Sequence, residues 1–517
     1  MKKLTLLLCF VSFLTNGQNI TVASGKSFTV EKTGSVTMSG NFSNSGTFTL
    51  NSDSDEFSSI IIGGSVTGNI TYNRYVNSVG TNEWDLIGSP VDGQSISSFA
   101  SANSSTLGTS SNIYAIGSYD NATNAWTNYT TSTIGSAGNF DRGRGYQMAS
   151  VSDGTGILKF TGTPASTTQT QAIINNDAAN AGTGTRWNLV ANPFPSYIHG
   201  NANAHATNNF LTVNTDKLHD SYEAIYGYDA DGSGYTAYNN TSSALNLAPG
   251  QAFMVASDNT SSDNISFTTD MRTIVGGDDL IVGDILEDTF ELIIKLYDGD
   301  TELDYTKFYF ADGLSLGLDP GYDAGNFNQG ASLMSRLVEE DEGVGLVINA
   351  MGLESVNDVV VPLEINRESG NNFRISIGTF DIYAGTNVYL EDNVQGTMTL
   401  LNEQDFELTP ENNLSGVGRF FLHLTETTFS IDNEVETNLL NVYKLDRNNF
   451  IIVEGLASQA NKTRLDLYNL LGKKVLSINL PNHTNSQTIS TEGLSSGIYV
   501  IKLQSSNSLL TKKLIVK

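Results

Sequence analysis

The chain has little of what stabilises small secreted proteins covalently. It contains one cysteine, Cys9, and nine prolines among 517 residues. Cys9 lies inside an apolar stretch at the start of the chain. A mature protein that has lost this stretch would have no cysteine, which excludes a disulfide framework. Burial of apolar side chains and β-pairing must therefore stabilise the fold.

Positive charge is also scarce. The chain has 27 Lys and Arg against 55 Asp and Glu, for a net charge of −28. Contacts with nucleic-acid phosphates or anionic lipids need cations, so we expect no nucleic-acid partner and no anionic membrane partner. Electrostatic repulsion between molecules, which keeps a protein soluble, explains the acidic excess best, and a role in holding divalent cations is the alternative.

The start of the chain has the pattern of a secretory signal peptide. A Met-Lys-Lys start is followed by the apolar run Leu4–Leu14 and then by the small residue Gly17. The run is too short to span a bilayer, so no transmembrane segment is expected. We predict that residues 1–17 are removed. Cys9 would leave with them, and lipid anchoring would require a cysteine at the cleavage point.

Helical spacing of apolar residues is nearly absent, and Leu333–Glu339 is the best short helix candidate. Short alternating runs separated by Gly, Asn and Asp recur instead, as is typical of strands and turns. We therefore predict an all-β, multidomain protein. The expected units are a signal peptide at 1–17, a solenoid-like β segment at 18–72, two copies of a β-unit at 73–180 and 181–272, a β-sandwich at 273–430, and a separate small domain at 438–517.

The solenoid-like segment is inferred from closely spaced short strands. Runs such as Ser27–Val30 and Ser35–Met38 are each followed by Gly or Asn before the next run begins. Such a pattern suits the rungs of a solenoid or a flat meander. So few rungs would be marginally stable alone, and we expect the segment to stack on the next domain.

The middle of the chain contains an internal duplication. Each copy opens on a Trp strand that ends at Pro, continues through a hairpin and a Gly turn, and closes with a Phe-Thr pair. Asp, Asn and Gly at the turns, with flanking aromatics, predict antiparallel hairpins. The aligned segments are Trp84–Pro90 with Trp187–Pro193, Tyr119–Tyr129 with Tyr228–Tyr238, and Gly143–Ser150 with Gly250–Ser257.

The end of the chain has the most specific pattern. It reads LDLYNLLGKKV at Leu465–Val475, GLSSGIYVIKL at Gly493–Leu503 and KKLIVK at the terminus. In order and spacing these motifs resemble the C-terminal sorting domain of proteins exported by the type IX (Por) secretion system of Bacteroidetes. The resemblance implies a small Ig-like β-sandwich, handling by that machinery, and a secreted or surface-attached protein. The residues that match the sorting motif are Gly472, Lys473, Gly497, Tyr499, Lys512 and Lys513.

Charge separates this tail from the body. Thr437–Lys517 holds ten Lys or Arg and four Asp or Glu, a net charge of +6. The mature chain carries −30 once Lys2 and Lys3 are gone, so the remainder carries −36. A basic tail on an acidic body indicates a separate functional unit. The second copy, with its NLVANPFPSYI segment, also resembles uncharacterised β-modules of large surface proteins that bear the same tail.

One turn of the second copy resembles the start of a calcium loop. Asp229, Asp231 and Ser233 place oxygens at alternate positions beside glycines, as a hard cation requires. Two observations favour an ordinary hairpin turn: the twelfth position is Asn240 rather than a bidentate Glu, and the matching turn after Asp120 in the first copy lacks the second Asp and the Gly. Calcium is therefore a candidate ligand of this turn, with an ordinary hairpin turn favoured, and no other cofactor is predicted.

Three other patterns are candidate sites. An acidic cluster after the strand that contains Tyr309 could coordinate Ca²⁺, although a solvated loop is favoured; its members are Asp312, Asp319 and Asp323. Three histidines share one segment of the second copy without the spacing of a zinc site, namely His199, His205 and His219. Arg142–Gly145 reads RGRG but lacks the helix start of a phosphate loop, so it predicts a turn.

The function follows less directly. Aromatic residues flank the hairpin turns and either stack on sugar rings or pack across strands, with packing favoured: Trp126, Tyr129, Tyr235 and Tyr238. We predict a secreted or cell-surface, non-enzymatic structural or adhesion protein whose partners are the secretion machinery and an extracellular glycan or matrix. The alternative is a polysaccharide hydrolase with paired carboxylates, which would face each other about 5 to 10 Å apart across a cleft.

Overall fold

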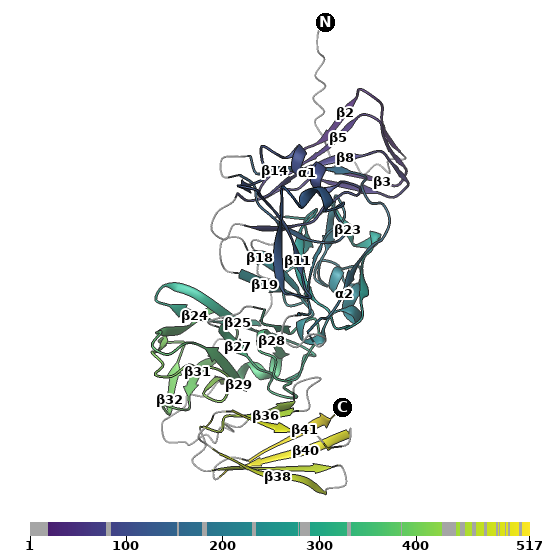
Figure 1. Cartoon of the computed structure of the whole chain (residues 1–517). Coiled ribbons are helices and arrows are strands. Elements are labelled where there is room, and N and C mark those ends of the chain that lie inside the picture. Colours follow the sequence, from purple (N-terminus) through teal and green to yellow (C-terminus); the bar gives the residue numbers. More distant parts are fainter. Residues whose placement is uncertain are drawn as a thin grey trace.

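The structure is a computed structural model of the chain. It describes residues 19–78, 84–151, 155–177, 184–229, 234–277, 279, 290–327, 332–383, 385–425, 441–444, 450–457, 462–469, 473–481, 484, 486–491, 493–494, 497–505 and 509–516. Strands dominate these residues, and their two α-helices are short: α1 (Ile96–Ala102) and α2 (Phe210–Asn214). The all-β prediction is confirmed. The domains follow one another from the N-terminal strands at one end of the molecule to the C-terminal sheets at the other (Figure 1).

The first strands stack in parallel, as the expected solenoid requires. Ile20 lies opposite Phe42, which lies opposite Val66, and Phe28 stacks on Phe48 with ring centroids 5.0 Å apart. Three parallel ladders result, so a flat antiparallel meander is excluded. They consist of β1 (Ile20–Val22), β4 (Phe42–Asn44) and β7 (Val66–Thr67); β2 (Ser27–Val30), β5 (Thr47–Asn51) and β8 (Ile70–Tyr75); and β3 (Ser35–Met38) with β6 (Ser59–Ile62).

The last rung of this solenoid also belongs to the next domain. Strand β8 pairs on its other side with β14 (Ile157–Gly162), in antiparallel register, with Tyr72 opposite Phe160. Both rings are fully buried in a core that the solenoid shares with the first β-unit. The small solenoid is therefore stabilised by a neighbour, as its size demands.

Four strands of each β-unit are arranged in the same order, and β10 (Thr109–Ser110) adds a fifth strand to the sheet of the first unit. Antiparallel sheets run in the order β9-β13-β11-β12 and β16-β21-β18-β19, so equivalent segments occupy equivalent places. The strands are β9 (Asp85–Ile87), β11 (Ile113–Asp120), β12 (Ala125–Thr130) and β13 (Tyr146–Met148) in the first unit, and β16 (Trp187–Ala191), β18 (Ile225–Asp229), β19 (Gly234–Tyr238) and β21 (Ala252–Ala256) in the second. Helices α1 and α2 follow the two Pro-terminated strands.

Strand pairing corrects the expected division between the units. Strand β15 (Gln169–Ile173) falls in the range assigned to the first copy, yet it pairs with β22 (Asp263–Phe267) of the second. The first unit has the same arrangement in β8 and β14. Each unit therefore begins with the strand that precedes its Trp strand. Motif alignment missed this because the partner of a strand lies about 90 residues away.

Smaller elements complete this part of the chain. They are β10 (Thr109–Ser110), β17 (Tyr197–His199), β20 (Asn246–Leu247) and β23 (Arg272–Thr273), with short 3-10 turns at Ile134–Ser136, Thr215–Lys217, Asp220–Tyr222 and Thr269–Met271.

The two units meet through equivalent residues. The Gly88 N–H donates to the Gly250 carbonyl at 2.8 Å, and the equivalent Ala191 N–H donates to the equivalent Gly143 carbonyl, also at 2.8 Å. The contact is therefore pseudo-two-fold. A Cβ added to Gly88 would lie 2.3 Å from the Ala191 Cβ, so equivalent positions cannot both carry a side chain. The pair Gly145 and Ala252 behaves in the same way, at 2.7 Å.

The third region forms one sheet rather than two. Eleven strands run in the order β32-β31-β34-β29-β27-β28-β25-β24-β30-β33, with β26 on β28. Phe373 and Phe406 near one end of this order share a core with Phe420, which lies 6.3 Å from Phe373. The sheet therefore curls around one core, where alternating strands had led us to expect a sandwich. The helix candidate Leu333–Glu339 is wrong, because Ser332–Ser335 forms β27.

The strands of this region are β24 (Phe290–Asp298), β25 (Thr301–Ala311), β26 (Ala324–Gly325), β27, β28 (Leu346–Gly352), β29 (Asp358–Asn366), β30 (Phe373–Asp381), β31 (Asn387–Asp392), β32 (Thr397–Leu400), β33 (Phe406–Leu408) and β34 (Phe420–Thr425), with a 3-10 turn at Leu353–Asn357.

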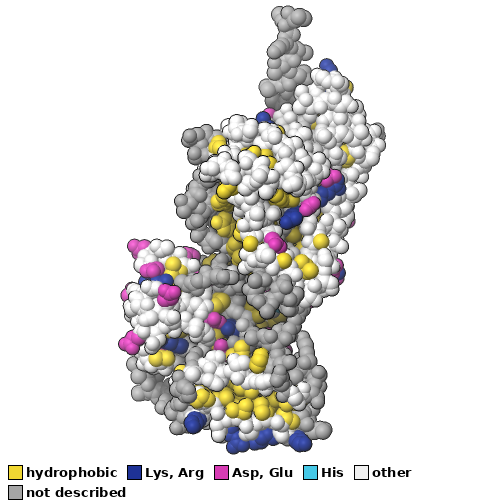
Figure 2. Space-filling view, in the orientation of Figure 1, with side chains coloured by type: hydrophobic (Ala, Val, Ile, Leu, Met, Phe, Trp, Pro, Cys, Tyr) yellow, Lys and Arg dark blue, Asp and Glu magenta, His cyan; other side chains and the backbone are white. Residues whose placement is uncertain are grey.

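The C-terminal domain consists of two sheets that share one apolar core. One contains β35 (Asn441–Lys444), β36 (Phe450–Glu454) and β39 (Ser486–Ser490), and the other β37 (Thr463–Asn469), β38 (Lys474–Leu480), β40 (Gly497–Gln504) and β41 (Leu509–Val516). Lys and Arg gather at this end of the molecule, whereas Asp and Glu are more frequent on the neighbouring third region (Figure 2).

The contact between the units predicts a rescue experiment. We expect Gly88→Ala to destabilise the mature protein by about 1–3 kcal/mol in urea unfolding, because the new methyl group overpacks against Ala191. The double variant Gly88→Ala with Ala191→Gly removes the clash between the two methyl groups but leaves the added Cβ 2.7 Å from the Arg144 carbonyl oxygen, so it should recover part of the loss. Gly135→Ala is the control, because nothing lies within 4 Å of its added Cβ. Equal losses in the single and double variants would contradict this packing.

Candidate functional site: an aromatic cleft

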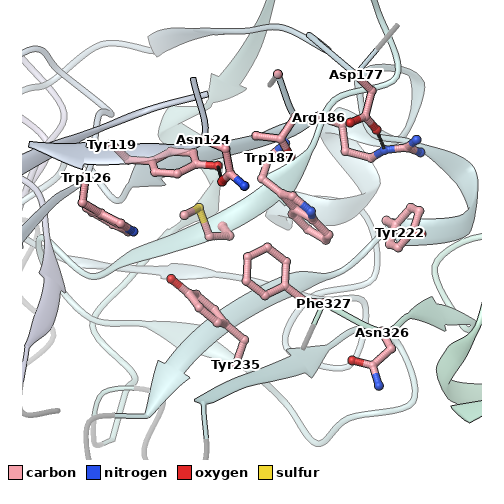
Figure 3. A pocket seen from close by; sticks show the side chains of 13 residues that line it. Tyr119, Asn124, Trp126, Asp177, Arg186, Trp187, Tyr222, Tyr235, Asn326 and Phe327 are labelled. Atoms are coloured by element: carbon pink, nitrogen blue, oxygen red, sulfur yellow. Dashed lines mark hydrogen bonds and ion pairs between the residues drawn. The ribbon is translucent and has the colours of Figure 1, made fainter. Parts of the chain in front are cut away.

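A cavity of about 670 Å³ lies where the two units meet the third region. This size is within the usual range for small-molecule sites. Each unit contributes a hairpin, and the third region contributes a segment that follows β26. The described lining is rich in aromatic rings, which face the cavity from several elements (Figure 3): Tyr119, Trp126, Trp187, Tyr222, Tyr235 and Phe327.

The first unit supplies one wall from its β11–β12 hairpin. Tyr119 lies opposite Trp126 in the strand register, and their ring centroids are 5.1 Å apart. The Tyr119 hydroxyl donates to Asn124 Oδ1 at 2.8 Å, and Asn124 adopts a positive φ of 50° at the turn. Burial raises the pKa of Tyr119 to about 12, so this phenol stays neutral. Trp126 remains 36% exposed and can still meet a ligand.

The second unit supplies the opposite wall from the equivalent hairpin. Tyr228 and Tyr235 occupy the positions of Tyr119 and Trp126, with centroids 5.2 Å apart. The duplication therefore places two matching aromatic pairs on the two hairpins that bound the cavity. Each pair is a cross-strand contact, which fixes the ring positions before any ligand arrives.

Phe327 of the third region packs against the wall of the second unit. Its ring lies 4.3 Å from Trp187, edge to face, and 4.3 Å from Tyr235. The preceding segment is fixed as well, since the Tyr226 hydroxyl donates to the Gly325 carbonyl at 2.9 Å. A Cβ on Gly325 would lie 2.1 Å from the Tyr222 ring, so only glycine permits this approach. The third region thus completes the site.

Polar groups at the rim are few and mostly paired. Arg186 Nε donates to Asp177 at 2.6 Å, and the guanidinium lies 5.1 Å from the centroid of the Tyr222 ring. Asn124 and Asn326 add amide groups. Among the described lining residues, Asp177 is the one carboxylate, and Arg186 neutralises it. The described lining therefore offers ring faces and hydrogen-bonding groups, without the two opposed carboxyls that glycoside hydrolysis uses.

The structure divides the predicted aromatic set. Trp126 and Tyr235 line the cleft, whereas Tyr238 is 9% exposed in the core of the second unit and Tyr129 packs against the core of the first. For these last two, cross-strand and core packing is confirmed. Sequence reasoning missed the role of Trp187, although it marked the duplication. Phe327 carried no signal, because only the fold brings it to the cleft.

A smaller cavity of about 360 Å³ occupies the equivalent place in the first unit. Trp84 there corresponds to Trp187, and Ile113, 43% exposed, corresponds to Tyr222. No equivalent of Phe327 is among its described lining residues. The copies have thus diverged in this feature, with the second copy carrying the more aromatic site.

The calcium candidates do not form a described site. Asp231 and Ser233 lie outside the described residues, and Asp229 is the last residue of β18, opposite Gly234 in a hairpin. In the acidic cluster, the two Asp323 oxygens accept N–H groups of Ala350 and Asp319, each at 2.7 Å. Across the described part of the chain, no group of three His, Cys, Asp or Glu side chains is placed to hold a metal ion. Calcium binding stays a prediction.

The other candidates have local roles. His199 and His205 lie 5.3 Å apart, but the Nδ1 atom of each of the three histidines bonds within its own neighbourhood, to Asn246, Asn208 and Ser221 respectively. The RGRG segment forms the predicted turn, with Gly143 at a φ of 73° and Arg142 donating to Gln169 at 2.6 Å.

The described residues of the sorting motif lie in or next to one sheet of the C-terminal domain. Tyr499 is buried in the domain core and Lys473 is exposed. Gly497 begins β40, and Lys513 pairs with Val500 on β41. Lys512 is half-buried opposite Ile501. Gly472 lies outside the described residues. The role of these six residues in sorting stays a prediction.

The body of the chain matches a protein family whose activity is not assigned. The family described as "Domain of unknown function (DUF8693)" matches residues 11–424, which is most of the chain. The chain belongs to this family. The "Secretion system C-terminal sorting domain" matches residues 447–517, so the predicted type IX sorting domain is confirmed. Strand β35, which pairs with β36, precedes the matched range and extends the folded domain.

The tail makes this family member a cargo of the type IX secretion system, destined for release or attachment at the outer surface. No curated protein matches the chain. Among solved structures, a chain titled "Biofilm associated protein - BSP domain" is 10% identical, with 87% of this chain and 96% of that chain covered at a TM-score of 0.17. A score this low does not establish a shared fold. None of the described helices has the length and apolarity needed to cross a membrane.

The buried carboxyl Asp323 predicts a pH dependence of stability. Burial raises its folded-state pKa from its ordinary value of 3.8 to about 7. A carboxyl group whose pKa is raised in the folded state makes its full contribution to stability below its unfolded-state pKa. This contribution to the free energy of unfolding is lost as pH rises through about 7. We expect the free energy of unfolding in urea to fall from pH 5 to pH 8, and to fall less in Asp323→Asn, which cannot titrate. Asp85, with a pKa of about 6, acts in the same direction.

The exposed Asp312→Asn is the matched control for this series, because it removes a carboxylate from the same cluster at the surface. It should leave the pH profile of the wild type unchanged. A profile in Asp323→Asn that is identical to that of the wild type would contradict the assignment.

Proposed function

We propose that this type IX cargo is a non-enzymatic structural or adhesion protein whose aromatic cleft binds an extracellular glycan. The observation that carries the proposal is the cluster of rings held in place on both sides of the cavity by the duplicated hairpins. A sugar ring presents an apolar face of C–H groups, and preorganised aromatic faces stack on it at little entropic cost.

The polar rim suits the same ligand. Sugar hydroxyls both donate and accept hydrogen bonds, as the amides of Asn124 and Asn326 do. The Arg186–Asp177 pair adds charged groups that can bond to hydroxyls without taking part in proton transfer. The hydrolase alternative needs two carboxyls across the cleft, and the described lining supplies one, already paired. Binding is therefore the function that we favour for this site.

The proposal predicts a loss of binding without a loss of folding. In a glycan array probed with the mature body, Trp126→Ala should weaken binding of the bound glycan by about tenfold or more, as removal of an anchoring aromatic typically does. Tyr383→Ala is the control, since Tyr383 is 42% exposed on the third region, away from the cleft. Equal glycan binding by the two variants would show that the cleft is not the glycan-binding site. Release of reducing ends from the bound glycan would instead favour the hydrolase.

Export is tested separately. Deleting residues 438–517 should leave the protein in the periplasm with its body folded, because the sorting domain is a distinct unit with its own core. Fractionation of cells, with circular dichroism of the retained protein, measures both outcomes. Normal appearance of the truncated protein at the cell surface or in the medium would contradict the role of the tail.

A further inference from the structure

Lys512 occupies an unusual position in the sorting domain. It lies opposite Ile501 on the edge strand β41, and paired residues of neighbouring antiparallel strands point to the same face of a sheet. Ile501 is fully buried in the domain core. Lys512 therefore points toward the core-facing side, where an ammonium group requires polar partners.

The third region supplies those partners through the segment Glu339–Glu342, the acidic loop. Lys512 Nζ donates to Asn441 Oδ1 at 3.4 Å, and Asn441 Nδ2 donates to Asp341 Oδ2 at 2.9 Å. Asn441 thus relays between the tail lysine and the carboxylate. Burial lowers the pKa of Lys512, while the charges of Asp341, Glu340 and Glu339 oppose that shift.

The acidic loop is held in this position from within the third region. Asp341 is 4% exposed, its Oδ1 accepts the Gly343 N–H at 2.9 Å, and Arg336 lies 3.8 Å from its Oδ2. Glu340 adopts a positive φ of 51°, a conformation that costs free energy for a residue with a side chain. The conformation of the acidic loop is therefore fixed by contacts within the third region and does not depend on the tail.

We propose that the acidic loop is a docking surface for the basic sorting domain and that it covers Lys512, so the secretion machinery must displace the body to reach this residue. Opposite charges on body and tail, −36 and +6, favour such docking over long range. The contacts described above support docking of the tail on the acidic loop. That docking blocks access of the secretion machinery to Lys512 follows only if Lys512 has its predicted role in sorting.

Docking is tested by amine footprinting of the full mature chain with a small acetylating reagent. The exposed Lys473 is the internal standard. We expect Lys512 to react at least about tenfold more slowly, which corresponds to about 1.4 kcal/mol for local opening. Asp341→Asn keeps the Oδ1 acceptor for Gly343 but turns an amide toward Asn441, so Lys512 should then react nearly as fast as Lys473. Asp300→Asn, an exposed carboxylate on the β24–β25 turn, should change nothing.

Salt provides a second test that needs no substitution. Raising the ionic strength to about 1 M shortens the screening length to about 3 Å and should speed acetylation of Lys512 in the wild type. Equal rates at Lys512 and Lys473 in the wild type would overturn docking. So would a Lys512 rate that responds neither to salt nor to Asp341→Asn.

Pulse-chase export then tests the competition. Export of Asp341→Asn should be faster than that of the wild type, with Asp300→Asn unchanged. Slower export of Asp341→Asn, together with a freely reactive Lys512, would show that docking aids the machinery and would overturn the competition while leaving the docking surface in place.

Discussion

The arrangement of the body depends on one close backbone approach, where the two β-units meet at Gly88 and Ala191. Two backbone hydrogen bonds between equivalent residues join the units. One links Gly88, just after β9, to Gly250, just before β21, and the other links Ala191, at the end of β16, to Gly143, before β13. The distance between the units is set by the absence of a methyl group on one side of the axis. Since both hairpins that bound the cleft extend from these sheets, their separation depends on the same contact.

Duplication explains why the cleft is aromatic. A cross-strand ring pair next to a hairpin turn stabilises a single unit. Two units related by a pseudo-two-fold axis bring both rings of the first pair, and Tyr235 of the second, to one cavity. The pair of the first unit is Tyr119 and Trp126, and that of the second is Tyr228 and Tyr235. Aromatic residues that stabilise the hairpin of each copy therefore also form a binding surface where the two copies meet. The third region then adds Phe327 to the second copy's side.

The sequence predicted the local features and missed the long-range ones. Alternating runs, turn residues and the repeated Trp-to-Pro strand were sufficient for the all-β class, the stacked rungs and the duplicated hairpins. Strand β15 was placed in the wrong unit because its partner β22 is far along the chain, and no local pattern encodes that pairing. Phe327 reaches the cleft only through the fold of the third region. Likewise, residues alternate between buried and exposed along β24 and β25 in the same way in a sandwich and in a single curled sheet, so this pattern could not distinguish the two architectures.

The central claim is that the cleft between the units binds a glycan, and intrinsic fluorescence tests it most directly. Of the three tryptophans, Trp126 and Trp187 line the cleft, so Trp84→Phe leaves the emission of these two alone. We predict that one class of oligosaccharide changes this emission saturably and shields Trp126 from a soluble quencher. Unchanged emission and quenching across neutral and acidic oligosaccharides, at millimolar concentration, would contradict the account.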